Sequence, residues 1–135
     1  MAGEENLKVL LKTMSPQLES EEYVFITLEG NYEDHKNLKP IGSFLEKEGL
    51  TFIITKTNAD ENNLKYEQVF KEITLEVHSS LNAVGLTAAV ANKLAEQNIS
   101  ANVVAAFYHD HIFVQTRLAL KALKALKTFT SKGST

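Results

Sequence analysis

Residues 73–114 read ITLEVHSSLNAVGLTAAVANKLAEQNISANVVAAFYHDHIFV, and this segment carries the most informative pattern in the chain. Apolar and polar residues alternate over 73–78, a pattern that is typical of a half-buried strand. A polar loop with one glycine follows, and then apolar residues recur at helical spacing, namely Val84, Ala88, Ala91, Leu94 and Ala95. Two more β-favouring runs come next, at 99–107 and 112–114. The stretch therefore predicts a strand, a loop, a helix and two further strands.

The N-terminal segment predicts a short helix followed by a buried strand. One face of the helix carries Leu7, Leu10, Leu11 and Met14. Ser15-Pro16 ends this helix, because proline cannot continue it. The run 23–28 is continuously apolar and β-favouring, as expected of a buried strand, whereas 30–40 is polar and predicted to be irregular.

Residues 41–55, IGSFLEKEGLTFIIT, are compatible with two structures. One is a short helix that Gly49 closes, and the other is a hairpin that turns at 46–49. Apolar residues flank the charged turn on both sides, which favours the hairpin. A short helix is predicted over 58–64, with Asn58 as its N-cap.

The C-terminal segment predicts an amphipathic helix. Its cations share one arc of the helix: Arg117, Lys121, Lys124 and Lys127. The opposite arc is apolar: Leu118, Ala119, Ala122, Leu123, Ala125, Leu126 and Phe129. Leu120 lies among the lysines, which hints at a contact outside the core. Because the whole chain is acidic, a solvated face is a better interpretation of the lysines than a lipid or nucleic-acid patch.

Composition excludes several classes of protein. The chain has 135 residues, 44% of them hydrophobic, which suffices for a core in one domain or two small ones. A net charge of −3 and a pI near 5.8 argue against a nucleic-acid-binding surface. No apolar run is long enough to span a membrane, and the N-terminus does not resemble a secretory signal. The absence of cysteine removes disulfides and thiol chemistry. We therefore expect a cytoplasmic protein that needs no cofactor.

The predicted elements repeat. Residues 4–64 and 69–129 each hold helices, strands and a strand pair, although residue-level similarity between them is slight. We expect an α+β fold of two units with boundaries at 1–66 and 67–135. Each unit would place its helices on one face of an antiparallel sheet.

The second half resembles an ACT domain, the small βαββαβ regulatory module that binds amino acids. The resemblance rests on a strand, a polar loop, the helix start 84–87 (VGLT), and EQNIS before the next strand. HSSLNAVGLTA and YHDHIFV, together with EKEGLT, are more closely similar to small bacterial proteins of tandem ACT-like type. This resemblance covers nearly the whole chain and implies a ferredoxin-like sandwich of two tandem or interleaved units.

The resemblance also implies a site. ACT modules commonly bind an amino acid between the first strand-to-helix loop and a neighbouring module, often across a dimer interface. Carried over to this chain, the site residues are Ser79, Ser80, Leu81, Asn82, Ala83, Val84, Gly85, Leu86, Thr87 and Asn102. His78-Ser79-Ser80 stands where many ACT domains have the aspartate of an Asp-x-x-Gly pattern.

Physical chemistry allows two interpretations of this loop. The unpaired N–H groups of a helix N-terminus suit a carboxylate, and Gly85 permits close approach of the backbone. Ser79, Ser80, Asn82 and Thr87 offer neutral donors and acceptors. Alternatively, Ser80 or Asn82 merely caps the helix and Gly85 merely permits tight packing.

His109-Asp110-His111 suggests two kinds of chemistry. With His78, the two histidines could bind a metal in a small hydrolase, because they would share one face of a strand. A turn between two strands, with its corner at 108–110, is the simpler and preferred explanation. A triad using Ser79 or Ser80 lacks the strained turn that presents a nucleophilic serine.

The resulting hypothesis is a non-enzymatic amino-acid sensor made of two ACT-like units, acting as a homodimer. Such a sensor would pass its signal to an unidentified protein partner through a shift in conformational populations. The alternatives are a protein-interaction module without a small ligand, and the metal-dependent hydrolase on His78, His109 and His111.

Overall fold

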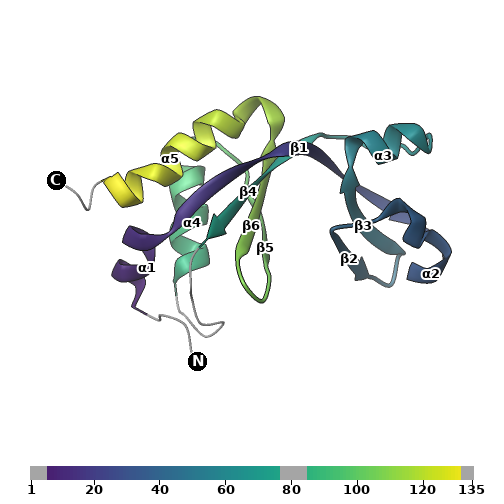
Figure 1. The fold of residues 1–135 in the computed structure, drawn as a ribbon, viewed down its shortest axis with the longest axis horizontal. Coiled ribbons are helices and arrows are strands. Elements are labelled where there is room, and N and C mark those ends of the chain that lie inside the picture. The colour runs from purple at the N-terminus through teal and green to yellow at the C-terminus, as the bar shows by residue number, and fades with distance from the viewer. Residues whose placement is uncertain (1–5, 77–84, 132–135) are drawn as a thin grey trace. The chain divides into compact units, whose positions relative to one another are not determined.

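The computed structural model describes residues 6–76 and 85–131 and divides the chain into two compact units (Figure 1). The larger unit combines the chain up to Ser20 with the chain from Lys71 onwards. The smaller unit is Glu21–Phe70. The N-terminal residues thus pack with the second half of the sequence. The expected division of the chain into two repeated units, 1–66 and 67–135, stays a prediction.

The described elements, in chain order, are α1 (Leu7–Thr13), β1 (Ser15–Leu28), α2 (Tyr32–His35), the 3-10 turn η1 (Lys36–Leu38), β2 (Gly42–Leu45), β3 (Leu50–Thr55), α3 (Lys56–Glu61), β4 (Phe70–Glu76), α4 (Leu86–Ala95), β5 (Asn102–Ala105), β6 (Asp110–Gln115), the 3-10 turn η2 (Thr116–Leu118) and α5 (Ala119–Ser131). Strand β1 contributes its first residues to the larger unit and the rest to the smaller one.

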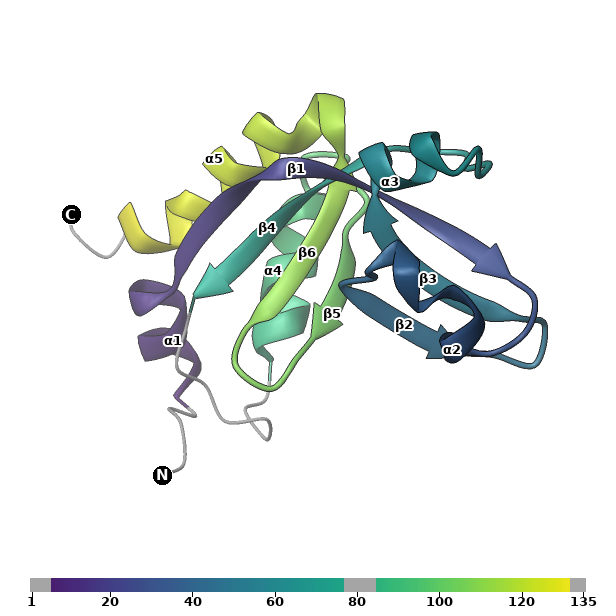
Figure 2. The same cartoon turned by 45° about the vertical axis from the view of Figure 1, so that its right-hand side comes forward.

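The larger unit is a sheet covered on one face by helices. Its hydrogen-bonded strand order is β1-β4-β6-β5, and α1, α4 and α5 lie on one side of these strands (Figures 1 and 2). The core is formed by apolar side chains of the helices, of alternate strand positions and of the residues just after α1 and α4: Leu10, Met14, Ile73, Leu75, Leu86, Val90, Leu94, Ile99, Ile112, Val114, Ala119, Ala122, Ala125 and Leu126. Helices on one face of such a sheet make this a ferredoxin-like α+β unit, as expected.

The smaller unit has the strand order β2-β3-β1 and a core of its own. Its buried residues are Val24, Ile26, Leu38, Leu50, Phe52, Ile54 and Ala59. Asn58 Nδ2 donates to the carbonyl of Leu38 at 3.1 Å, which ties α3 to η1. The short helical elements are therefore fixed by both packing and hydrogen bonding.

The hairpins of the two units share one register. Gly42 lies opposite Ile53 in the β2–β3 hairpin, and Asn102 lies opposite Phe113 in the β5–β6 hairpin. The paired residues of the second hairpin lie 60 positions after those of the first, since 42 corresponds to 102 and 53 to 113. The chain reverses in each over four residues, with the N–H of Glu46 bonded to the Gly49 carbonyl and that of Ala106 to the His109 carbonyl. The expected hairpin at 41–55 is thus confirmed.

Several details of the elements differ from expectation. The segment 30–40 is not irregular, because it holds α2 and η1. The N-cap of α3 is Thr55 and not Asn58, since the Thr55 side chain accepts from the Asn58 N–H at 3.1 Å. In the run 99–107, only Asn102–Ala105 is strand.

The buried faces of β4 and α4 also differ from those expected. β4 is buried on both faces along part of its length, because Glu72 and Thr74 are buried as well as Ile73 and Leu75. The buried stripe of α4 is Leu86, Val90 and Leu94, while Ala88 and Ala95 are exposed. Of the residues expected on that face, Leu94 is confirmed, and Val84 lies outside the described residues.

Candidate functional site

The N-terminus of α4 begins at a glycine that the backbone requires. Gly85 is the N-cap and has φ +96°, ψ −11°, which places it in the left-handed region. A Cβ built there would lie 3.2 Å from Cδ2 of Leu7 in α1. Glycine therefore meets two needs here, an unusual φ and close approach of a neighbouring helix.

The expected site residues divide into described and undescribed ones. Ser79, Ser80, Leu81, Asn82, Ala83 and Val84, together with His78, lie outside the described residues. Leu86 is 4% exposed and belongs to the core, so its side chain is not available to a ligand. Thr87 is exposed in the first turn of α4. Gly85 and Thr87 therefore remain the described candidates at this end.

Asn102 lies at the other end of the unit. It is the first residue of β5, and its Nδ2 donates to the Phe113 carbonyl at 3.2 Å. Figure 1 shows α4 and β5 running in opposite directions, so Asn102 lies toward the end of α4 whereas Gly85 stands at its start. A ten-residue helix is about 15 Å long. Within one chain, the structure does not bring Gly85 and Asn102 together.

A polar cluster lies on the sheet face opposite the helices. His111 Nδ1 and Glu72 Oε2 are 2.8 Å apart, which joins β6 to β4. The Thr74 hydroxyl donates to Glu19 Oε2 at 2.7 Å, joining β4 to β1. Apart from this cluster, near the start of β4, Lys71 Nζ donates to the Ser20 carbonyl of β1 at 2.8 Å. Polar side chains thus link the three strands β1, β4 and β6.

Burial raises the pKa of two carboxyl groups, one on β4 and one on β6. Desolvation raises the pKa of the Glu72 carboxyl above its ordinary value; His111 opposes this shift and Glu19 adds to it. Burial likewise raises the pKa of Asp110, against the opposing effect of His111 and His109. His109 Nδ1 is buried with no hydrogen-bond partner.

The metal hypothesis gains no support from this geometry. Across residues 6–76 and 85–131, no three His, Cys, Asp or Glu side chains stand close enough to hold a metal ion. His111 contacts Glu72, and the His109 carbonyl closes the hairpin turn.

Sequence reasoning did not find the Glu72–His111 pair. The two residues are 39 positions apart, and Glu72 precedes the residues expected to form the strand. A buried carboxylate facing another strand leaves no local signal in the sequence.

Comparison with known proteins identifies the family. ACT domain profiles match residues 2–71 and residues 71–128. The chain belongs to the ACT domain family. ACT domains are regulatory rather than catalytic, and they generally bind small ligands, most often amino acids. The expected fold and the expected tandem arrangement of two ACT domains are both confirmed.

Solved structures agree with this assignment. A protein of unknown function from Vibrio cholerae, described as a possible transport protein, is 51% identical with a TM-score of 0.86, covering 92% of this chain and 95% of that one. The ligand-free regulatory subunit of aspartate kinase from Thermus thermophilus is 10% identical with a TM-score of 0.63, covering 87% and 97% of the two chains. Clostridium acetobutylicum aspartate kinase, an allosteric enzyme, is 8% identical with a TM-score of 0.61, covering 87% of this chain and 34% of the kinase.

The two kinase likenesses show the fold alone. No curated protein matched the chain. Among the helices that the structure describes, none has the length and apolar character needed to cross a membrane.

Proposed function

We propose that this chain is a cytoplasmic, non-enzymatic regulatory protein that binds a free amino acid and acts as a homodimer of tandem ACT units, 1–66 and 67–135. The ligand would be held by the loop from Ser79 to Thr87 in the second unit, together with Asn102. The observation that carries this proposal is the left-handed Gly85 at the start of α4, in a chain that matches ACT domains along most of its length.

The chemistry of an amino acid suits the two ends of this site. The first N–H groups of α4 lack intrahelical partners and carry a partial positive charge, so they would bind the ligand carboxylate. The absence of a side chain at Gly85 would let the carboxylate approach the backbone. The side-chain oxygen of Asn102 can accept a hydrogen bond from the ligand ammonium.

A second copy would bring these ends together. β5 ends the strand order of the larger unit, and an edge strand offers unpaired N–H and C=O groups to another chain. If two copies of β5 paired antiparallel, Asn102 of the second copy would lie opposite the hairpin end of the first β5. Figure 1 places that end on the same side of the unit as the start of α4. Dimerisation would then complete a site that one chain leaves divided.

The test is a thermal-shift screen against the twenty amino acids. A ligand present at 100 times its Kd adds about 2.7 kcal/mol to the unfolding free energy, a rise of about 10 °C for a domain of this size. The shift should shrink in Thr87→Val and Asn102→Ala, and it should persist in Asn92→Ala, an exposed residue of α4. Silence across the panel at millimolar concentration would reject the amino-acid proposal.

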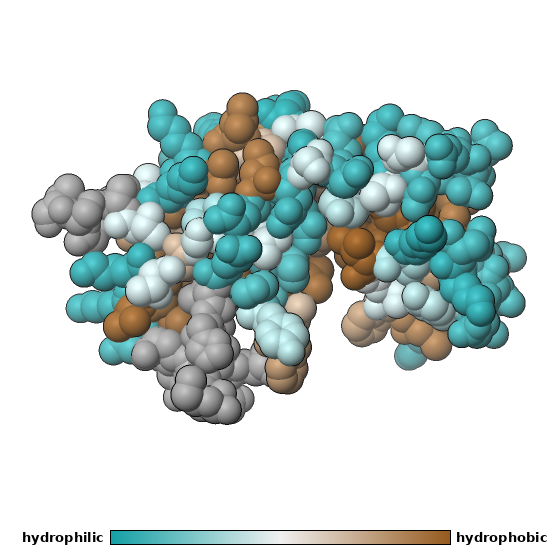
Figure 3. Space-filling view, in the orientation of Figure 1, coloured by the Kyte–Doolittle hydropathy of each residue, from teal (hydrophilic) through white to brown (hydrophobic). Residues whose placement is uncertain are grey.

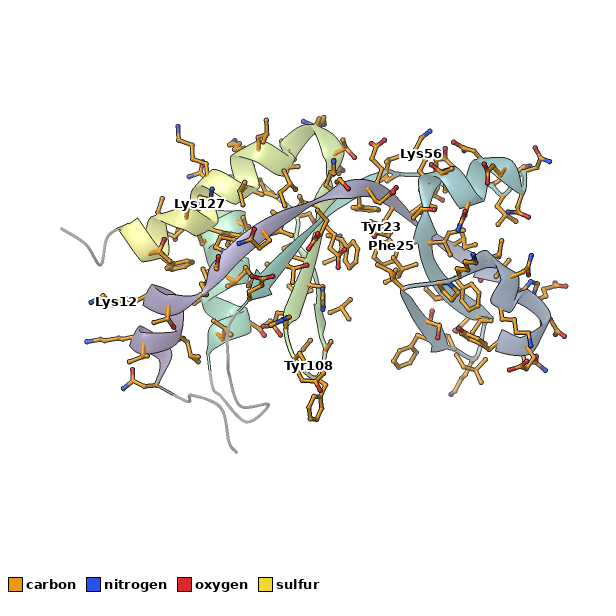
Figure 4. The ribbon with its side chains drawn as sticks, viewed as in Figure 1. Lys12, Tyr23, Phe25, Lys56, Tyr108 and Lys127 are labelled. Atoms are coloured by element: carbon orange, nitrogen blue, oxygen red, sulfur yellow. The ribbon has the colours of Figure 1, made fainter. Side chains whose placement is uncertain are left out.

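An interaction module without a small ligand is the second candidate, because aromatic residues project from the β5–β6 hairpin. Phe107 and Tyr108 are 74% and 76% exposed, with ring centroids 5.0 Å apart. Figure 4 shows Tyr108 at the hairpin tip, and Figure 3 shows apolar colour there. Exposed aromatic pairs are common at protein interfaces. A silent amino-acid screen combined with dimerisation that Phe107→Ser abolishes would favour this candidate.

A further inference from the structure

Positive charge gathers at the C-terminal end of an acidic chain. Five of the fourteen Lys and Arg residues fall within the last 25 positions, and none of the seventeen Asp and Glu residues does. The first 110 residues therefore hold nine cations against seventeen acids, a formal charge of −8. Charge segregation of this kind favours an acidic partner for the C-terminal helix.

Two of these cations, Lys121 and Lys124, border a groove between α4 and α5, which is also lined by Lys93 and by one acidic residue, Glu96. The groove has a volume of about 390 Å³, and it is lined by Lys93, Glu96, Gln97, Lys121, Lys124, Ala125 and Thr128. Lys121 Nζ donates to the Gln97 carbonyl at 3.1 Å, and Lys93 Nζ lies 5.1 Å from the centre of the Phe129 ring. Lys93 on α4 and Lys121 on α5 are thus each held by a contact with the other side of the groove.

An exposed leucine adds an apolar contact beside the lysines. Leu120 is 74% exposed, and it shares a face of α5 with Lys124 because the two are four residues apart. The apolar arc on the opposite side of α5 packs in the core, where Ala122 and Leu126 are fully buried. Leu120 is therefore available to a partner, whereas the core face of α5 is not.

We propose that the α4–α5 groove binds an acidic segment of another protein, with carboxylates meeting the lysines and an apolar side chain meeting Leu120. A membrane surface would require a broad apolar helix face, but that face of α5 is buried. Nucleic acid normally needs an extended surface of clustered Lys and Arg, whereas this groove holds three lysines with Glu96 among them. The residues that line the groove do not include Gly85, Thr87 or Asn102 of the proposed amino-acid site, so either proposal can fail without the other.

The probe is a fluorescent helical peptide of about twenty residues with Glu at i, i+3 and i+4 positions and one Leu per two turns. The control peptide carries Gln in place of every Glu. Anisotropy titration of the full chain should show binding of the Glu peptide that weakens with added salt. The Lys121→Gln/Lys124→Gln variant should bind about tenfold more weakly, because two exposed ion pairs are lost. Lys47→Gln/Lys65→Gln makes the same charge change in the smaller unit and should bind like the parent.

Other outcomes would overturn the proposal. Equal binding of the Gln peptide, equal loss in both double variants, or no binding at millimolar peptide would each do so. Tighter binding to phosphatidylserine vesicles or to single-stranded DNA than to the peptide would assign the groove to those partners. Self-association abolished by Lys121→Gln/Lys124→Gln would identify a second copy as the occupant. Urea unfolding curves of both double variants show whether each one is folded, so that weaker binding can be distinguished from a folding defect.

Discussion

Replacing Gly85 by alanine tests the backbone geometry at the start of α4. A left-handed conformation costs an alanine about 1–2 kcal/mol, and the new Cβ would lie 3.2 Å from Leu7 Cδ2. Alanine also restricts the unfolded chain, which returns about 0.4–1 kcal/mol. The unfolding free energy should therefore fall by about 1 kcal/mol, measured by urea titration with an unchanged m-value.

Gly42 supplies a matched control. Its Cβ would also meet a side-chain methyl at 3.2 Å, Cδ1 of Ile53, but its φ is not in the left-handed region. Gly42→Ala thus reproduces the crowding without the backbone strain, and it should change stability by less than about 0.5 kcal/mol. Gly85→Asn should cost less than Gly85→Ala, because asparagine tolerates the left-handed region. Equal losses of unfolding free energy in Gly42→Ala and Gly85→Ala would show that the left-handed backbone at Gly85 carries no extra cost for alanine.

Three further predictions concern packing, charge and assembly. Leu126→Ala should cost about 2–5 kcal/mol in urea unfolding, whereas Leu120→Ala on the same helix should cost under 0.5, because one side chain is fully buried and the other is 74% exposed. Glu72→Gln should gain stability relative to the parent as the pH rises through 4.5 and above, since burial raises the pKa of Glu72 and its ionised form disfavours folding; a difference that is flat with pH would contradict this. Val104→Lys on β5 should shift sedimentation from dimer to monomer, and an unchanged dimer would place the contact elsewhere.

Local patterns predicted those elements whose faces differ sharply in polarity. On α5, the lysine arc and the apolar arc are separated as expected, since Ala122 and Leu126 are buried and Leu120 is exposed. The hairpin at 41–55 followed from a charged turn between apolar runs. Leu10 of α1 and Met14, the C-cap of that helix, are buried, as their spacing predicted.

Features that depend on distant contacts were not predictable in this way. β4 reads as half-buried, yet Glu72 and Thr74 are covered because side chains of β6 and β1 reach them. α4 is rich in alanine, so its spacing alone does not separate the Val90 stripe from the Ala88 face. The sequence identified the candidate residues of the site loop. It did not predict that Gly85 and Asn102 lie at opposite ends of α4, because that placement depends on the direction in which β5 runs.

Strand β1 belongs to both units, because its first residues pack in the larger unit before the smaller unit begins. The larger unit is written in two pieces, up to Ser20 and from Lys71, with the smaller unit inserted between them. Cutting the chain once after residue 66 would strip the larger unit of its first strand and leave β4 with an open edge. A circular permutant that joins the original ends and opens between Phe70 and Lys71 would make each unit continuous. The smaller unit is thus inserted into the sequence of the larger one. A fragment for expression should follow the boundaries of the compact units and not the two halves of the sequence.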